Sequence, residues 1–421
     1  MNARAEAGTA RLDLLDALRG SALLGILLLH AVEHWDFVVP PDARPAWLEA
    51  LDNQAMGWAY LLFGGKAYAI FALMFGISFH ITLQAWHARS KHPSGRFLWR
   101  LALLGTLGYV HGLLYCGDIL TVIAALGVPL VLLNRLGTRA LACVAAVLLL
   151  QLPQWPDALR VLADPAYQPA PPRYWALYAQ TVPVFSSGSF TDVLALNAGT
   201  GQAAKWWWVI ETWRWPQMLG LFACGLLVGR SGVLRDPVRL RRMAWRALAA
   251  GGAGWLAVWL ARRGIDTLGL KDLRHATVAS LADMLGNLAQ MAIWAGGFVL
   301  LWGRARARRA LSLLVPYGRM SLTCYATQAV FGVPFFYGFG LGMYHHVGPL
   351  MALGFGASVF LVQLSFARWW LARYTHGPLE WVWRAATLRT WHLPLRRTPS
   401  DAHGLDAPPT NRTPSLDSRS P

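Results

Sequence analysis

Ten long apolar runs constrain this chain more than any other feature of its sequence. A helix that crosses the hydrocarbon core of a bilayer needs about 20 mainly apolar residues, and most of the runs approach or exceed that length. Only 14% of the 421 residues are charged, against about 25% in soluble domains, so too few polar side chains are present to cover a water-facing surface. The sequence therefore predicts an all-α, polytopic membrane helix bundle. The expected spans lie approximately at residues 17–39, 58–85, 97–115, 119–136, 140–155, 206–229, 247–261, 280–302, 320–337 and 348–371.

The fourth, fifth and seventh runs are short or weakly bounded, so nine or eleven spans fit the pattern as well as ten. The distribution of Lys and Arg predicts the orientation, because positively charged loops stay on the cytoplasmic side. With both termini in the cytoplasm, about 28 of the 38 basic residues fall in cytoplasmic segments. The formal net charge of +17 is thus mainly a consequence of topology, and nucleic-acid binding is not expected. The predicted location is a bacterial inner membrane, with membrane lipid as a partner.

Two terminal segments flank the membrane domain, which we place at residues 17–391, and one long loop lies within it. Residues 1–16 are expected to form a cytoplasmic N-terminal segment, and residues 392–421 a disordered cytoplasmic tail, because they are rich in Pro, Ser, Thr and Arg and have no apolar periodicity. Residues 156–205 form an outer loop that is long enough to hold an interfacial helix over a pocket, or to be a loosely ordered connector. The four cysteines lack metal-ligand spacing, so no metal site is expected.

Several ionisable side chains fall inside the apolar runs, where each costs roughly 2.5 to 3.5 kcal/mol and so needs a partner, a water-filled cavity or a function. The helical rise places His30 about 20 Å and His111 about 21 Å from the inner boundary, and Lys66 about 12 Å below the outer boundary. In a core about 30 Å thick, these three reach a similar height. Neighbouring spans add further polar side chains at or near this level: Glu33, His34, Asp118, Glu211, Arg214, Asp283, Asn287 and Gln290. We expect a polar cavity that opens outward.

Structural alternatives exist for each of these residues. His111 is either a helix-to-helix hydrogen-bond partner or a direct participant in chemistry. Lys66 either neutralises Asp118 or Glu211, or binds substrate or phosphate. Glu211 and Arg214 stand three residues apart, a spacing that favours an ion pair on one helix, although contact with substrate is also open.

Motifs along nearly the whole chain resemble those of YeiB-type membrane proteins, the domain of unknown function 418. The first is the run from Leu14 to Gly20, which reads LLDALRG, and it is followed by the matches at residues 64–76, 111–120, 318–325, 336–342 and 377–381. The first helix is also similar to that of transmembrane acyltransferases, including acyltransferase family 3 and heparan glucosaminide acetyltransferase. In acyltransferase family 3 a basic residue precedes a catalytic His by ten intervening positions, and Arg19 and His30 have that spacing.

This resemblance implies an acyltransferase that moves an acyl group from a cytoplasmic acyl-CoA to a cell-envelope glycan or lipid. His30 would be the general base, with His111 as support and Asp118 as the orienting carboxylate. Lys66 or Asn287 would stabilise the developing oxyanion. Arg19 would contact the phosphates of acyl-CoA, which is a co-substrate rather than a bound cofactor, or would only reach lipid phosphate at the helix end.

Two other functions suit the same residues. A transporter or flippase for a small anionic or lipid-linked solute would use the buried charges, Glu211 and Arg214 among them, as a binding site and proton relay. The hydropathy pattern has no inverted repeat and no paired broken helices, which counts against that interpretation. A non-catalytic membrane partner would use the polar layer only to fix helix packing.

Overall fold

The computed structural model describes residues 2–36, 44–87 and 92–396, with side chains from residue 13 onward. Within these ranges the fold is an all-α membrane helix bundle, as the sequence predicts. Six helical segments in the described residues are long and apolar enough to cross a membrane, at residues 13–32, 46–87, 93–114, 138–163, 272–302 and 349–371, and a shorter apolar helix runs from Leu120 to Leu133. Every expected run has a helical counterpart, while the number of membrane crossings stays a prediction.

The first half of the chain contains α1 (Asn2–Val32), α2 (Ala46–Leu62), α3 (Ala67–His87), α4 (Pro93–Leu114), α5 (Leu120–Leu133) and α6 (Thr138–Leu149). The expected outer loop is itself helical. It contains α7 (Trp155–Ala163), α8 (Arg173–Ala179), α9 (Thr181–Ser187), α10 (Phe190–Leu196) and the start of α11 (Gln202–Glu211). The segment is therefore a folded layer, and α11 brings its residues into the bundle.

The second half contains α12 (Arg214–Arg230), α13 (Pro237–Thr267), α14 (Asp272–Trp302), α15 (Ala305–Leu311), α16 (Val315–Arg319), α17 (Ser321–Phe336), α18 (Pro349–Leu371) and α19 (Pro378–Leu388). Several of these helices begin with proline, which needs no N–H partner in the first turn. At α13 the side chain of Asp236 also accepts from the N–H groups of Val238 and Arg239. Of the expected tail, residues 392–396 extend beyond α19, and the rest lies outside the described residues.

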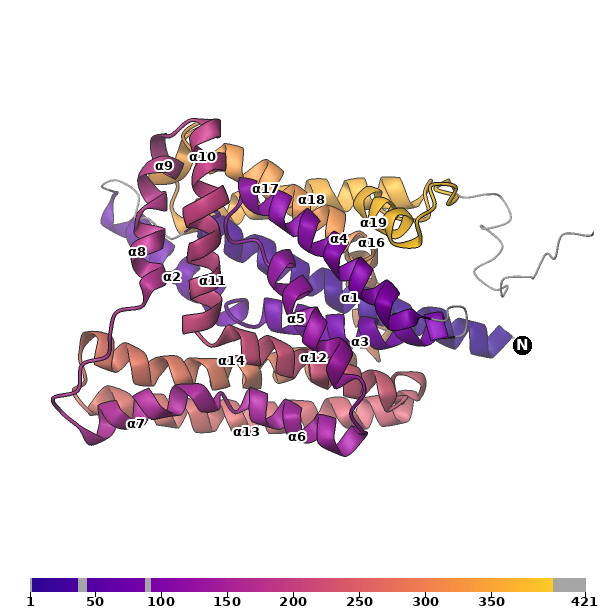
Figure 1. Cartoon of the computed structure of the whole chain (residues 1–421), viewed down its shortest axis with the longest axis horizontal. Coiled ribbons are helices and arrows are strands. Elements are labelled where there is room, and N and C mark those ends of the chain that lie inside the picture. Colours follow the sequence, from indigo (N-terminus) through magenta and orange to yellow (C-terminus); the bar gives the residue numbers. More distant parts are fainter. Residues whose placement is uncertain (1, 37–43, 88–91, 397–421) are drawn as a thin grey trace, which may run out of the picture.

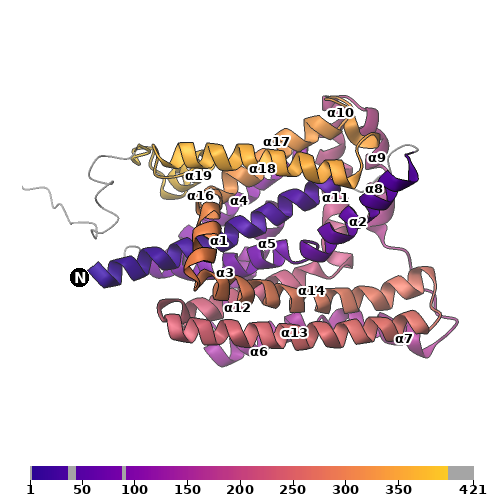
Figure 2. The same cartoon turned by 180° about the vertical axis from the view of Figure 1, so that it is seen from behind.

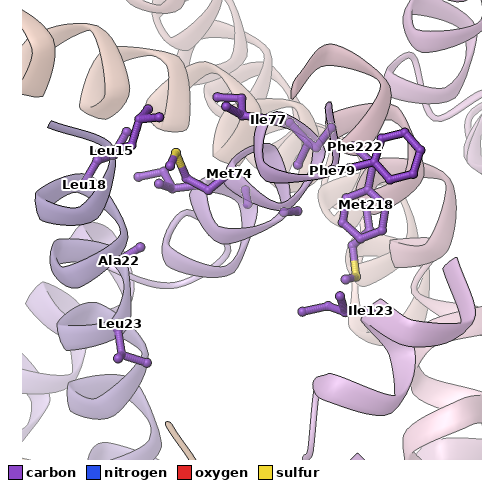
Figure 3. Close-up of a cluster of buried hydrophobic side chains, with 14 of the residues drawn as sticks. Leu15, Leu18, Ala22, Leu23, Met74, Ile77, Phe79, Ile123, Met218 and Phe222 are labelled. Carbon is purple, nitrogen blue, oxygen red and sulfur yellow. The ribbon is translucent and has the colours of Figure 1, made fainter. Parts of the chain in front are cut away.

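The helices form three layers (Figures 1 and 2). α13 and α14 lie side by side along one edge, α17 and α18 lie along the opposite edge, and α1, α3, α5 and α12 lie between them. Figure 3 shows buried apolar side chains of this middle layer, among them Leu18 of α1, Met74 of α3 and Phe222 of α12. The central layer positions the polar residues discussed next.

Candidate functional site

A cavity of about 780 Å³ opens between α1, the start of α3, the turn after α4, α13 and α14. We call it the chamber. Five of the eight candidate residues line it: His30, Lys66, Asp118, Arg214 and Asn287. Glu33, Asp283 and Gln290 line it as well, as the shared height of these residues predicts. His34 does not belong to it, because its ring stacks on Phe336 with centroids 4.4 Å apart.

His30 faces the chamber within a group of aromatic rings. Its ring centroid lies 5.0 Å from that of Tyr115, 6.1 Å from that of Trp35 and 6.2 Å from that of Tyr325. Among the described residues, none forms a hydrogen bond with the imidazole. The ring is therefore neither turned toward lipid nor held by a protein partner, and its nitrogens remain available to a molecule in the chamber.

His111 and Asp118 form a buried pair beside His30. His111 Nδ1 lies 2.9 Å from Asp118 Oδ1, and the carboxylate also accepts from the Thr121 backbone N–H at 3.0 Å and from the Thr121 hydroxyl at 2.6 Å. Burial alone would raise the pKa of Asp118, in the turn between α4 and α5, but these hydrogen bonds hold its pKa below the ordinary value. His111 Nε2 is buried without a hydrogen-bond partner within the described residues, so the pair presents one nitrogen without a protein partner.

The local sequence brings this pair together through a close approach of α4 and α5. A side chain at Gly108 would place its Cβ 2.9 Å from Asp118 Oδ2 and 2.6 Å from the Thr121 nitrogen. Glycine leaves room for the carboxylate there. Lys205, on α11, then donates to the Thr121 hydroxyl at 3.0 Å, which connects the folded outer segment to the pair.

Lys66 and Arg214 occupy breaks in two helical segments. The chain leaves α2 at Leu62, passes Gly65 with φ +75°, and begins α3 at Ala67. It leaves α11 at Glu211, passes Trp213 with φ 54°, and begins α12 at Arg214. Lys66 does not neutralise Asp118 or Glu211, because its Nζ donates instead to the Tyr60 carbonyl at 2.8 Å. Asn287 packs against Gly65, where a Cβ would lie 2.3 Å from the Asn287 amide nitrogen.

The ion pair expected between Glu211 and Arg214 is absent from the described structure. The prediction assumed one continuous helix, but the break at Trp213 places the two residues on different helices. Glu211 accepts from the Tyr174 backbone N–H at 3.2 Å, outside the chamber lining. The Arg214 guanidinium lies over the rings of Trp208 and Tyr68, at 4.6 and 4.8 Å from their centroids.

Arg19 lies at a second, smaller cavity of about 230 Å³, at the end of the bundle that Arg19, Arg100 and Arg319 share and that we call the Arg-rich end. Its guanidinium donates to Asp16 at 2.7 Å and to Ser78 at 3.1 Å. Arg100 and Arg319 line the same cavity. Tyr325 lines both cavities, so its side chain stands between the chamber and the Arg-rich end.

Three residues of this arrangement did not emerge from the sequence as site residues. Lys205 directly precedes Trp206–Trp208, a run typical of an interfacial belt, which hides its inward position. Arg262 lines the chamber from α13, but Arg263 directly follows it, so the sequence does not distinguish the two. Tyr325 ends the motif at residues 318–325, so the family resemblance did contain a signal for it.

An apolar helix bundle around a polar chamber defines an integral membrane protein with a binding site inside the bundle. Comparison with known proteins then gives the family. Residues 228–390 match the family model described as "Protein of unknown function (DUF418)". The chain is 30% identical to the uncharacterized protein YeiB of Escherichia coli K12, over 89% of this chain and 96% of YeiB. It belongs to the YeiB-type, DUF418 family.

A second relative is similar over nearly the same share of both chains. The uncharacterized protein YxaH of Bacillus subtilis strain 168 is 26% identical over 92% of this chain and 97% of YxaH. No solved structure matches this chain.

Proposed function

We propose that the protein transfers an acyl group from a cytoplasmic acyl-CoA to an acceptor in the cell envelope, a glycan or a lipid. The observation that carries this proposal is the position of His30 in a chamber that Tyr325 separates from a second, arginine-lined cavity. A donor that enters from the Arg-rich end would meet an acceptor in the chamber near Tyr325. The proposal places the Arg-rich end in the cytoplasm of a bacterium and the protein in its inner membrane, with several crossings.

The chemistry requires one proton to leave the acceptor. Its hydroxyl or amine attacks the thioester carbonyl carbon, His30 takes the acceptor's proton, and the C–S bond breaks as the tetrahedral intermediate collapses. The proton then goes to the departing CoA thiolate. Lys66 and the Asn287 amide provide donors for the oxyanion from the chamber wall.

His111 and Asp118 act behind His30 in this proposal. The Asp118 carboxylate orients the His111 ring through Nδ1, and Nε2 has no hydrogen-bond partner within the described residues. This oriented imidazole supports the proton transfer. Arg19 contributes less to donor binding than the family resemblance implies, since Asp16 already neutralises it, and Arg100 takes its place as the phosphate contact.

Comparative mass spectrometry of envelope lipids and glycans tests the proposal. Cells with the wild-type protein are compared with cells carrying His30→Ala, and with a matched control, His345→Ala, whose residue lines neither cavity. Loss of one acyl modification in His30→Ala alone, at normal protein abundance, supports acyl transfer. An unchanged acyl profile would refute it.

A transporter is the second candidate function, and a specific observation favours it. The sequence pattern had no paired broken helices, but the structure has two helix breaks at the chamber, before α3 and before α12. Broken helices around a central site are typical of secondary transporters. A solute-uptake or lipid-translocation defect in His30→Ala cells with an unchanged acyl profile would favour this function.

A further inference from the structure

The helices α3 and α12 start side by side at the chamber and run in the same direction. Gly76 of α3 approaches the backbone of Phe222, where a Cβ would lie 2.1 Å from the carbonyl oxygen, and Gly225 approaches Leu73 equally closely. Near their starts, the Tyr68 hydroxyl bonds the Gln217 side chain. Because the pair is parallel and close, the positive ends of both helix dipoles point to one region of the chamber.

Each of these helix starts carries a basic residue without a carboxylate partner. Lys66 is 4% exposed, and its hydrogen bond goes to a neutral carbonyl. Arg214 has a buried Nε that lacks a partner. Within the described residues, no Asp or Glu forms an ion pair with either of them. Of the other two chamber cations, Lys205 donates to the neutral Thr121 hydroxyl and lies near Asp118, and Arg262 pairs with Asp283 at 3.7 Å.

An ammonium, a guanidinium and the positive ends of two helix dipoles therefore lie at the same part of the chamber. A buried cation needs a counter-charge, and a group with several negatively charged oxygens suits this set. Within the described residues, the acids of the chamber form no ion pair with either cation. Asp283 acts on Lys66, and Glu33 on Arg214, only from beyond ion-pair distance. Asp118 pairs with His111, and Asp36 accepts hydrogen bonds from Tyr344 and Thr181.

One wall of the chamber is apolar and lies at the surface of the bundle. Leu61 of α2 is 45% exposed, and Trp255 and Trp259 of α13 are 38% and 42% exposed. In a membrane-embedded bundle such a wall faces acyl chains, not water. A ligand that enters here must be amphiphilic.

We propose that the starts of α3 and α12, with Lys66 and Arg214, bind the phosphate headgroup of a lipid whose chains leave the chamber between α2 and α13. The idea that this lipid is the acyl acceptor rests on the proposed acyl transfer. The binding of the lipid does not, because a binding experiment measures it without turnover.

The test measures binding to the full-length protein in maltoside detergent micelles, which contain no phosphate of their own. Thermal unfolding is followed with phosphatidic acid added to the micelles, with diacylglycerol added instead, and with inorganic phosphate in the buffer. We expect phosphatidic acid to raise the unfolding temperature, and diacylglycerol and inorganic phosphate to leave it unchanged. Lys66→Met and Arg214→Gln should each weaken the lipid's effect about tenfold, whereas Arg263→Gln, the same charge change on the exposed side of α13, should leave it intact.

Equal protection by phosphatidic acid in Lys66→Met and wild type would overturn the site. If inorganic phosphate protects the protein as much as phosphatidic acid does, the site binds an anion without needing a lipid, and the lipid proposal is overturned. If a variant does not fold, the wild-type protein still decides the matter through cross-linking. Phosphatidic acid with a photoreactive group in its chain should label α2 or α13 near Leu61, Trp255 or Trp259, and labelling elsewhere contradicts the proposal.

Discussion

Basic residues at the two cavities differ in their partners. At the Arg-rich end, Arg19 pairs with Asp16 at 2.7 Å and Arg319 pairs with Asp13 at 2.8 Å. In the chamber, Lys66 and Arg214 form no ion pair with any described residue. A paired cation stabilises the fold, whereas a buried unpaired cation costs stability unless a ligand completes it. The contrast is the reason why we propose ligand binding in the chamber.

The largest expected effect concerns the buried pair beside His30. Asp118→Ala removes a fully buried carboxylate that takes three hydrogen bonds, and we expect a loss of roughly 3 to 5 kcal/mol in the free energy of unfolding. Denaturant titration in detergent measures it. Because the pKa of Asp118 is lowered in the fold, its contribution is complete above about pH 4 and is lost as the pH falls further. A loss that does not diminish at low pH would contradict this assignment.

The close packing of α3 on α12 should be nearly as sensitive. Gly225→Val introduces a Cβ 2.1 Å from the Leu73 carbonyl oxygen, so the helices must separate, at a cost of about 1 to 3 kcal/mol or more. Gly252→Ala is the control, since a Cβ at Gly252 meets nothing within 4 Å, and it should be neutral or slightly stabilising. Thermal unfolding compares the two variants. Similar melting temperatures would show that the helices do not pack as described.

Exchanging cations for neutral side chains tests the contrast between the cavities directly. Arg19→Met leaves Asp16 with Arg319 alone and should cost on the order of 1 kcal/mol. Lys66→Met removes a buried charge without a carboxylate partner and should cost less, or stabilise the ligand-free protein. Thermal unfolding in detergent without added lipid measures both. The reverse order would mean that Lys66 has a structural role.

The smallest effect is expected at the ion pair of Arg262 and Asp283. Its side chains are 31% and 58% exposed and its charges lie 3.7 Å apart, so Arg262→Gln should cost no more than about 0.5 kcal/mol. Unfolding at low and high salt measures the difference between wild type and variant. A difference that persists at high salt would show that the pair is shielded from solvent.

The sequence predicted the chamber better than it predicted the contacts inside it. Helical rise alone predicted one height for His30, Lys66 and His111. In the structure, His30 and Lys66 line the chamber, and His111 lies beside it in a hydrogen bond with Asp118. The hydrogen-bond and ion-pair partners were harder to predict from the sequence, because they depend on which helices face each other. Glu211 and Arg214 looked like a pair on one helix, and only the break at Trp213 separates them. Lys205 looked interfacial until α11 carried it inward to Thr121.

The sequence by itself determined that this chain is an all-α membrane protein, because the length and spacing of apolar runs leave no other place for most of its residues. It also predicted a shared height for His30, Lys66 and His111, from a fixed rise per residue. Only the tertiary structure decided which charges are neutralised. That outcome depends on helix breaks and on glycine contacts between α3 and α12, which bring distant residues within bonding distance and leave Lys66 and Arg214 without carboxylate partners.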